Sequence, residues 1–436
     1  MSCNWPIVKL GDYCSKIGSG ATPKGGNSVY LDHGEISLIR SQNIYNEGFK
    51  SDGLVYITPE AAQKLKNVII EPNDVLINIT GDSVARVCLA PNEFLPARVN
   101  QHVAILRVDP EEFDHRYLRY FLTSTKMQNY LLTIASTGGT RNALTKSMLE
   151  SLEVSKPSLD VQKRIGDVLE SFESKIELNS RTNQTLEEMA QAIFKSWFVD
   201  FDPVKAKMNG EQPEGMDAAT ASLFPEKLVE SELGLIPEGW EVNQLSDICK
   251  NHSQSYDLKS VDEVIFVNTG DVLEGDFLHK DYSPVAGLPG QAKKAIKEDD
   301  ILYSEIRPKN KRFAYVDFDV SDYVVSTKFM VIQANEKVHP RLLYMILTRQ
   351  NTIDEFNVIA DSRSGTFPQI TFKAISNLNF CIAPREVQDA FVTQVMPMIK
   401  LQRSLKTENK QLAELRDTLL PKLLSGEIEL EAATEN

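Results

Sequence analysis

Two stretches of the chain have residue types and spacings that could carry enzyme chemistry. Gly18-Ser19-Gly20-Ala21-Thr22-Pro23 begins like a dinucleotide-binding loop, but proline occupies the third glycine position and no strand-to-helix unit encloses it, so we interpret it as a turn. Asp300 and Glu305 faintly resemble the carboxylate pair of a nuclease, with Arg307 in place of the usual lysine. The sequence contains no GxxxxGKS or GxxxxGKT phosphate loop and no Asn/Asp-Pro-Pro-Tyr/Phe methyltransferase motif. We therefore expect a non-catalytic protein.

The residue types that bind metals are scattered. Six histidines show no HExxH spacing, and five cysteines, at positions 3, 14, 88, 249 and 381, form no CxxC pair. We expect no metal site, no cofactor in this chain and reduced thiols in a cytoplasmic compartment. Met1 to Pro6 lack a basic region followed by an apolar run, and nowhere do eighteen uncharged apolar residues follow one another. Secretion and membrane spanning are not expected.

The elements that must position functional residues occur twice in the chain. Trp5-x4-Leu10-x-Asp12-x-Cys14 recurs as Trp240-x4-Leu245-x-Asp247-x-Cys249, and from residue 74 onward matching residues keep an offset of 226. Ile79 stands where the second half has Glu305, which argues against a duplicated nuclease site. Each half combines apolar runs typical of strands with short helical patterns, so we expect an α+β fold with two homologous mixed α/β domains.

Each half ends in a long helical pattern whose seam residues step alternately by four and three, as in a coiled coil. The first seam comprises Ile165, Leu169, Phe172, Ile176, Asn179, Asn183, Leu186, Ala190, Ile193 and Trp197, and adding 226 gives the second seam. A helix of about 35 residues is roughly 50 Å long, so we interpret both helices as spacers. Asn183 and Asn409 share one seam position, where a buried polar side chain penalises wrong registers; alternatively both are partly exposed. Pro421 predicts a kink or a stop near Leu420.

The connector between the halves is rich in proline, glycine and acidic residues. Residues 200–239 hold nine acidic and three basic residues, and residues 427–436 hold four acidic and no basic residues, so these stretches carry most of the net charge of −14. That charge predicts weak DNA binding by the chain alone and a need for partners with positive surface. The expected organisation is a first domain at 1–155, a first spacer helix at 156–200, a connector at 201–239, a second domain at 240–383, a second spacer helix at 384–426 and an acidic tail at 427–436.

In their order, twice over, these features resemble the specificity subunits of type I restriction–modification systems. The resemblance covers nearly the whole chain and rests on the Trp-x4-Leu-x-Asp openings, Gly20-x-Thr22-Pro23, the Asp-Val/Ile-Leu strands, the Gly-Thr pairs at 139 and 365, Pro157-x3-Val161-Gln162, Pro384-x2-Val387-Gln388, and Phe194 to Phe201 followed by Ile236 to Trp240. It implies a pseudo-twofold protein in which two target-recognition domains, held apart by two antiparallel helices that form a coiled coil, each read one half of a split DNA site. It also implies two adenine-modifying methyltransferase subunits and motor-nuclease subunits as partners, which would bring S-adenosylmethionine, ATP and Mg.

Side chains that read DNA bases present paired donors and acceptors, as Arg does to guanine and Asn or Gln to adenine. Polar clusters near strand ends are the expected places, although Asn, Thr and Gly also simply make turns and the Arg307–Arg312 stretch could be a solvated hairpin tip. In the first half the candidates are Arg40, Gln42, Asn43, Asn78, Thr80, Arg98, Asn100, Gln101, Thr140, Arg141 and Asn142. In the second half they are Asn268, Arg307, Lys309, Asn310, Lys311, Arg312, Lys328, Arg363, Thr366 and Gln369.

The outer faces of the long helices and the region 189–201 are the expected surface for partner subunits. The residues assigned to this surface or to the coiled coil are Asn183, Leu186, Phe194, Trp197, Phe198, Asn409, Leu412 and Leu419. For the three aromatic residues, core packing against the connector is an equal alternative. A coiled-coil assembly scaffold that binds no nucleic acid would explain the acidity, but it explains less well why the halves share apolar residues and differ in their polar loops.

Overall fold

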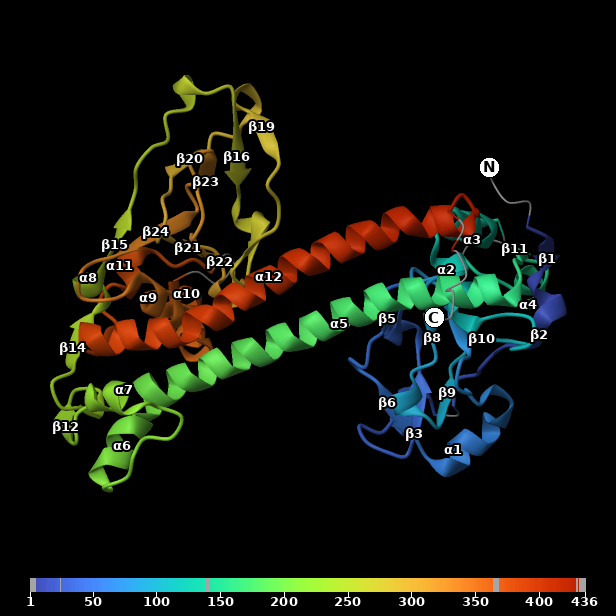
Figure 1. Ribbon diagram of the computed structural model, residues 1–436, viewed down its shortest axis with the longest axis horizontal. Helices are drawn as coiled ribbons and strands as arrows, with labels where there is room; N and C mark the ends of the chain where they lie inside the picture. Colours follow the sequence, from blue (N-terminus) through green and yellow to red (C-terminus); the bar gives the residue numbers. More distant parts are fainter. Residues whose placement is uncertain (1–4, 24, 138–141, 364–367, 429, 431–436) are drawn as a thin grey trace, which may run out of the picture. The chain divides into compact units, whose positions relative to one another are not determined.

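The computed structural model describes residues 5–23, 25–137, 142–363, 368–428 and 430 (Figure 1). The chain forms two compact units. The first unit joins Met1–Thr182 to Ser404–Asn436, and the second unit is Asn183–Arg403. Both long helices therefore contribute to both units.

The first unit is built on two sheets. The four-stranded antiparallel sheet has the order β2 (Cys14–Ser19), β10 (Val103–Val108), β7 (Val75–Asn78), β8 (Val87–Leu89), and the three-stranded sheet has the order β6 (Val55–Ile57), β3 (Ile36–Ile39), β9 (Ala97–Val99). Alternate residues of β7 enter different cores: Val75 and Ile77 pack with Leu106, whereas Leu76 packs with Ile105. Because both faces are covered, β7 and β10 read in the sequence as continuous apolar runs.

The second unit repeats this plan. Its antiparallel sheet has the order β15 (Cys249–His252), β24 (Phe329–Ala334), β21 (Ile301–Ser304), β22 (Phe313–Tyr315), and its other four-stranded sheet has the order β19 (Tyr282–Pro284), β16 (Glu263–Val267), β23 (Tyr323–Ser326), β20 (Ala292–Ala295). Strand β16 runs parallel to β23, as β3 runs parallel to β9. The two homologous mixed α/β domains predicted from the repeat are confirmed.

Smaller elements also recur in both units. The first unit contains β1 (Ile7–Lys9) paired with β11 (Glu153–Ser155), the hairpin β4 (Ile44–Tyr45)–β5 (Gly48–Phe49), α1 (Pro59–Lys64), α2 (His115–Thr123), α3 (Thr125–Ser136) and α4 (Lys146–Glu150). The second contains β14 (Glu241–Gln244) paired with β25 (Asn379–Ile382), the hairpin β17 (Val272–Leu273)–β18 (Asp276–Phe277), α8 (Leu245–Ile248), α9 (Pro340–Thr348), α10 (Gln350–Arg363) and α11 (Phe372–Ile375).

The long helices are α5 (Leu159–Lys195) and α12 (Arg385–Leu424) (Figure 1). In the first unit they run antiparallel, since Glu173 lies near Arg416 and Lys175 near Glu408. In the second unit Phe194 meets Phe391 and Asn183 meets Gln402, again antiparallel. Pro421 was predicted to kink the helix or to end it near Leu420, but α12 continues to Leu424 and does not end there. Pro421 lies in the last turn, where a proline removes only one helix hydrogen bond.

One buried glutamine ties each domain to its long helix. Gln162 of α5 accepts a hydrogen bond from the Asp114 backbone N–H (3.0 Å) and donates to the carbonyls of Glu112 (3.1 Å) and Pro157 (3.0 Å). Gln388 of α12 makes the same three bonds, with the backbone of His339, Lys337 and Ala383. Both side chains are fully buried, so these bonds fix the angle at which the long helix leaves its domain.

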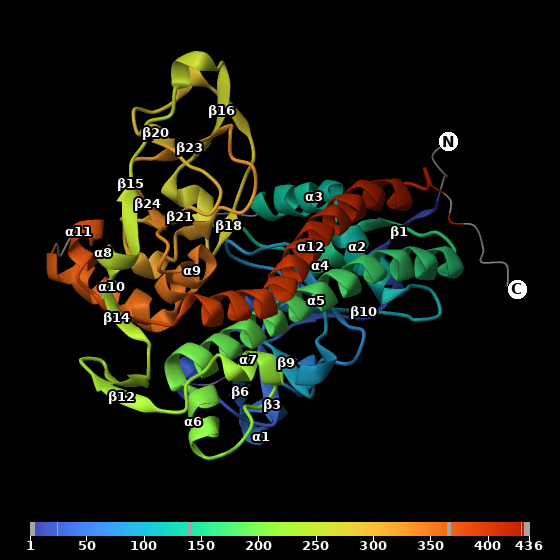
Figure 2. The ribbon, with the colours of Figure 1, turned by 60° about the vertical axis from the view of Figure 1, so that its left-hand side comes forward.

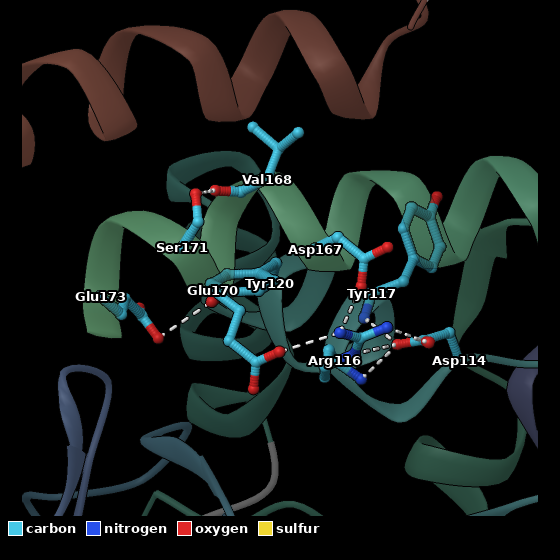
Figure 3. A network of polar contacts seen from close by, with 9 residues as sticks. All are labelled: Asp114, Arg116, Tyr117, Tyr120, Asp167, Val168, Glu170, Ser171 and Glu173. Carbon is cyan, nitrogen blue, oxygen red and sulfur yellow. Dashed lines mark hydrogen bonds and ion pairs between the residues drawn. The ribbon is translucent and has the colours of Figure 1, made fainter. Parts of the chain in front are cut away.

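A polar network joins α2 to α5 in the first unit (Figure 3). Asp114 caps α2 through the backbone N–H groups of Arg116 and Tyr117, and it also binds the Arg116 guanidinium. The other side of Arg116 reaches Asp167 (2.6 Å) and Glu170 (2.8 Å) of α5. Burial alone would raise the pKa of Asp114, but the hydrogen bonds from Arg116 and the Tyr117 backbone outweigh burial and lower it.

The connector folds back onto the end of α5 in the second unit. It contains α6 (Asp202–Met208), α7 (Ala218–Ser222) and the hairpin β12 (Leu228–Ser231)–β13 (Gly234–Pro237), which Figure 2 shows together near the end of α5. After Lys195 the chain makes one π-helical turn, and Phe201, in the left-handed conformation (φ 56°), ends it. Phe224 of the connector packs edge-on against Trp197 (5.1 Å between ring centres).

Candidate nucleic-acid interface

The loops that follow the central strands of the first unit meet at one edge. Because β3 and β9 run parallel, the loops 40–43 and 100–102 leave the same end of the sheet, and the antiparallel pairing of Asn78 with Val103 adds the turn 79–86. Side chains connect these loops: Asn78 Nδ2 donates to the Ser41 carbonyl (2.9 Å), and Thr80 Oγ1 contacts His102 Nδ1. A bridge from Thr80 to Ala143 adds the segment before α4.

Gly20 packs against the backbone of this edge at Val99 and Asn100. A Cβ at Gly20 would lie 1.7 Å from the Val99 carbonyl oxygen, so only glycine fits, and its N–H donates to the Asn100 carbonyl (3.1 Å). The Gly18–Pro23 stretch was predicted as a turn, but Gly18 and Ser19 end strand β2, and Gly20 serves a close backbone contact.

Four of the first-half candidates are buried and used inside the protein. Asn43 is 0% exposed and bonds the Arg40 N–H and the carbonyls of Lys50 and Asp52. Asn78 is also 0% exposed, Asn100 caps its own loop by accepting from the His102 N–H, and Arg98 donates to the carbonyls of Ala62 and Ala97. We withdraw these four from the DNA-contacting set, because they are buried and bonded within the protein; Asn78 Oδ1, which has no hydrogen-bond partner among the described residues, is buried as well.

The remaining described candidates of the first half lie at the surface of the edge. Gln42 and Asn142 are exposed, while Arg40, Thr80 and Gln101 are half-buried. Arg40 lies over the Tyr30 ring at 5.3 Å and donates to the Gly53 carbonyl. Thr140, Arg141 and Thr366 lie outside the described residues; Arg363 is the last residue of α10, and its side chain also lies outside the description.

In the second unit the basic turn 307–312 occupies the equivalent edge. Arg307 has a left-handed backbone (φ 44°), and its N–H donates to the Pro368 carbonyl (3.0 Å). The Lys309 N–H donates to Asn357 Oδ1 of α10 (2.8 Å). Arg307, Lys309 and Asn310 are exposed, so their side chains are accessible to a polyanion.

Other candidates of this edge have internal roles as well. Lys311 forms an ion pair with Glu274 (2.9 Å), and Arg312 donates to the carbonyls of Gly270 (3.0 Å) and Val272 (2.9 Å), which holds the β17–β18 hairpin against the turn. Asn268 caps its own loop by accepting from the Thr269 N–H. Lys328 is half-buried, and Gln369 is exposed and bridges to Ile306, as Ala143 does to Thr80.

Sequence reasoning missed a stacked group on the β4–β5 hairpin. Two cations lie over the Tyr45 ring, with Lys50 Nζ 4.4 Å and the Arg86 guanidinium 4.7 Å from the ring centre. The signal was available, because Arg86 matches Arg312 at the offset of 226. His102, which stands beside the candidates Asn100 and Gln101, matches Lys328 at the same offset.

The site has no catalytic arrangement among the residues that the structure describes. Within that part of the chain, no cluster of three or more histidines, cysteines and acidic residues could hold a metal ion. Burial raises the pKa of the Cys88 and Cys249 thiols to about 12, so they stay protonated at neutral pH. None of the described helices is long and apolar enough to cross a membrane.

The aromatic residues assigned to a partner surface belong largely to the core of the second unit. Phe194 is 6% and Trp197 4% exposed, so the partner assignment is wrong for these two and the core-packing alternative holds. Phe198 is half-buried between Phe391 and Trp240, and it lines a cavity of about 300 Å³ together with connector residues such as Leu235. Asn183, Leu186, Asn409, Leu412 and Leu419 lie half-buried along the helix seam.

The seam position shared by Asn183 and Asn409 makes different polar contacts in the two units. In the first unit Asn409 meets Asn179, whose Nδ2 donates to Asn409 Oδ1 (2.9 Å) and to Glu408 Oε2 (2.8 Å). In the second unit Gln402 donates to the Asn183 carbonyl (3.0 Å) and to Glu187.

This arrangement, a duplicated domain with polar loop edges and long helices, is typical of a recognition protein. Residues 3–188 and 237–415 both match the family described as "Type I restriction modification DNA specificity domain". The chain belongs to this family and is a specificity subunit of the type I restriction–modification class, which confirms the resemblance seen in the sequence.

Individual relatives agree with this assignment. The chain is 26% identical to the type I restriction enzyme MjaIX specificity subunit of Methanocaldococcus jannaschii over 440 residues, 98% of this chain and 94% of that one. It is 47% identical to the HindI specificity subunit of Haemophilus influenzae over 179 residues, which is 40% of this chain and 39% of that subunit. The crystal structure of the type I restriction–modification S subunit from M. genitalium has the same fold, with a TM-score of 0.59, 16% identity and 96% of both chains covered.

Proposed function

We propose that the loop edge of each unit reads one half of a bipartite DNA target, with an unspecified gap whose length the two long helices set. The observation that carries this proposal is that equivalent backbone frames carry different polar side chains. The Asn78 N–H bonds the Arg86 carbonyl, and the Ser304 N–H bonds the Arg312 carbonyl, both at 2.9 Å. Between these anchors the first unit has Gly81 to Ala85, and the second has the basic stretch Arg307 to Lys311. Two readers of different half-sites should differ in this way.

We further propose that two methyltransferase subunits and the motor-nuclease subunits bind this chain in the cytoplasm. S-adenosylmethionine, ATP and Mg would belong to those partners. Met189 of α5 and Leu415 of α12 support two equivalent docking positions, since they are 226 residues apart and 46% and 47% exposed. Two exposed apolar side chains at one repeat position are what two copies of the same partner would contact.

The docking proposal is tested by native mass spectrometry of the assembled complex. Met189→Glu or Leu415→Glu should each remove one methyltransferase subunit, and the double variant both. Glu188→Gln, on the neighbouring exposed position, is the matched control. Retention of two methyltransferase subunits by the double variant would contradict this docking surface.

The recognition proposal is tested by enrichment of random-sequence duplexes on the complex with its methyltransferase subunits. We expect a motif of two fixed blocks separated by a fixed gap. Arg307→Ala should relax the sequence in one block only, whereas Lys227→Ala in the connector should change neither. A complex that assembles but enriches no sequence would favour the scaffold alternative.

A further inference from the structure

The β4–β5 hairpin carries two cations that have no acidic partner in the described part of the chain. Lys50 Nζ and the Arg86 guanidinium lie over the same Tyr45 ring, 4.4 Å and 4.7 Å from its centre. Neither forms an ion pair with a carboxylate of the described residues. Two like charges over one ring repel each other, and an anion bound beside them would offset that repulsion. Lys50 is exposed and Arg86 is half-buried, so both can be reached from solvent.

This hairpin is fixed to the loop edge of the first unit. Strand β4 begins directly after the loop 40–43. Asn46, in the turn of the hairpin, accepts through Oδ1 a hydrogen bond from the Val87 N–H (2.9 Å), just after the turn 79–86. Its Nδ2 donates to Gln128 Oε1 of α3 (3.2 Å). The two cations therefore stand beside the loops proposed to read DNA, on a hairpin that is held at both its start and its turn.

The equivalent hairpin of the second unit carries leucines instead. The hairpins β4–β5 and β17–β18 pair in the same register. Leu273 therefore stands where the first unit has Tyr45, and Leu278, the residue after β18, stands where it has Lys50. The two leucines are 40% and 55% exposed. The aromatic ring and the lysine over it are thus specific to the first unit.

The arginine that the two units share is used differently. Arg312, the equivalent of Arg86, donates from Nη1 to the carbonyls of Gly270 (3.0 Å) and Val272 (2.9 Å), which occupies it inside the protein. The side chain of Arg86 makes no hydrogen bond to the described residues and contacts the Tyr45 ring instead. A guanidinium has five N–H donors, and stacking on a ring leaves them free for a ligand.

We propose that Lys50 and Arg86, positioned by the Tyr45 ring, bind the phosphate backbone of the DNA at the first half-site. This rests on the proposed function. An ammonium group binds phosphate as a point charge, and a guanidinium can bind two phosphate oxygens at once. Because every sequence has the same phosphates, this contact adds affinity without selecting bases. The hairpin of the second unit, with its two leucines, lacks the contact.

The alternative is that the two cations only stabilise the hairpin by covering the Tyr45 ring. The dependence of affinity on salt separates the two roles. A side chain that neutralises a DNA phosphate releases counterions on binding, so its loss lowers the slope of log affinity against log salt by about one unit. Loss of a contact within the protein leaves that slope unchanged.

The test measures affinity for the enriched bipartite duplex by fluorescence anisotropy at about 50 to 200 mM salt, on the complex with its methyltransferase subunits. Lys50→Ala and Arg86→Ala should each weaken binding several-fold and lower the salt slope by about one unit, and the double variant should lower it by about two. Lys50→Arg should keep the affinity and the slope. Lys64→Ala is the matched control, because this exposed lysine of α1 follows β6 at the opposite end of the three-stranded sheet.

The enriched motif gives a second readout. Because phosphates carry no sequence information, the double variant should enrich the same two blocks and the same gap as the unmodified chain. A changed first block would mean that these side chains read bases and would contradict the phosphate contact.

The two levels of the argument fail differently. A double variant with unchanged affinity and salt slope would overturn the role of Lys50 and Arg86 and leave the proposed function standing. If the unmodified complex enriches no duplex at all, both fail. Co-purification of each variant with its methyltransferase subunits, with an unchanged thermal unfolding temperature, shows that the variant is folded.

Discussion

The buried carboxylates of Asp74 and Asp300 are equivalent in the repeat but have different partners, and this difference predicts responses of different size to the same substitution. Asp74, 0% exposed, accepts hydrogen bonds from Arg107 Nε (2.7 Å) and Nη2 (2.8 Å). Asp300, 1% exposed, accepts from the neutral amide of Gln333 (2.8 Å) and from the Lys297 N–H (2.9 Å). Burial therefore raises the pKa of Asp300, and the hydrogen bonds only partly offset it.

Asp74→Asn leaves the Arg107 guanidinium facing an amide. Removal of one partner of a buried ion pair costs about 3–5 kcal/mol. Arg107 is 21% exposed and keeps its bonds to Glu71 and the Ile69 carbonyl, so we reduce the expected loss to about 2–3 kcal/mol.

Asp300→Asn removes a buried charge that has no hydrogen-bonded cation. It loses the bond from the Lys297 N–H but keeps an acceptor for Gln333, so the net change at pH 7 should stay within about 1 kcal/mol. The sign of the pH effect follows from the raised pKa. The folded state holds the proton more tightly than the unfolded state, so stability falls as the pH rises from the ordinary aspartate range through the raised pKa. The asparagine variant should lack this fall.

Amide hydrogen exchange separates the two units in one experiment, because β7 reports on Asp74 and β21 on Asp300. We expect a protection loss of about 2–3 kcal/mol in β7 of Asp74→Asn and a much smaller change in β21 of Asp300→Asn. Equal losses at pH 7 would show that the charge of Asp300 is as well compensated as that of Asp74 and would refute the reasoning.

Three further predictions concern the helices and the aromatic core. Gln162→Leu and Gln388→Leu should each destabilise their own unit by about 2–3 kcal/mol, measured by hydrogen exchange, because buried backbone groups lose their partner. Loss of protection in the other unit would contradict the view that each glutamine stabilises only its own unit. Asn179→Leu with Asn409→Leu should raise the thermal unfolding temperature and broaden the gap lengths accepted in the enriched DNA motif, and an unchanged gap would mean that other contacts fix the register. Trp197→Ala should destabilise the second unit by about 3–5 kcal/mol in denaturant titrations, unless the core collapses around the cavity.

The fold could be predicted from the sequence because the repeat and the seam are patterns of apolar spacing, which burial imposes directly. Positions in the loops were harder. Asn43 and Asn142 are the same residue type in polar loops, yet one is fully buried in its own turn and the other is exposed. Burial of a loop side chain depends on distant segments, such as the packing of Gly20 on Val99, that local composition does not encode.

The aromatic residues at the end of α5 show that the sequence also does not distinguish a partner-facing surface from a core. Trp197 fits equally well on a partner-facing surface and in a core until the position of the connector is known. A residue-by-residue comparison of the two halves would have helped, because it pairs His102 with Lys328 and Arg86 with Arg312 directly.

The division of the long helices between the units affects the order in which the protein can fold during synthesis. The core of the first unit contains Leu423 (1% exposed) and Leu424 (9% exposed) beside Leu10 and Leu169. The second unit, Asn183–Arg403, is a continuous segment that is synthesised before those leucines. The domain that begins the chain is therefore completed last, and a ribosome that stalls after residue 403 would release a chain whose second unit is complete and whose first unit lacks part of its core.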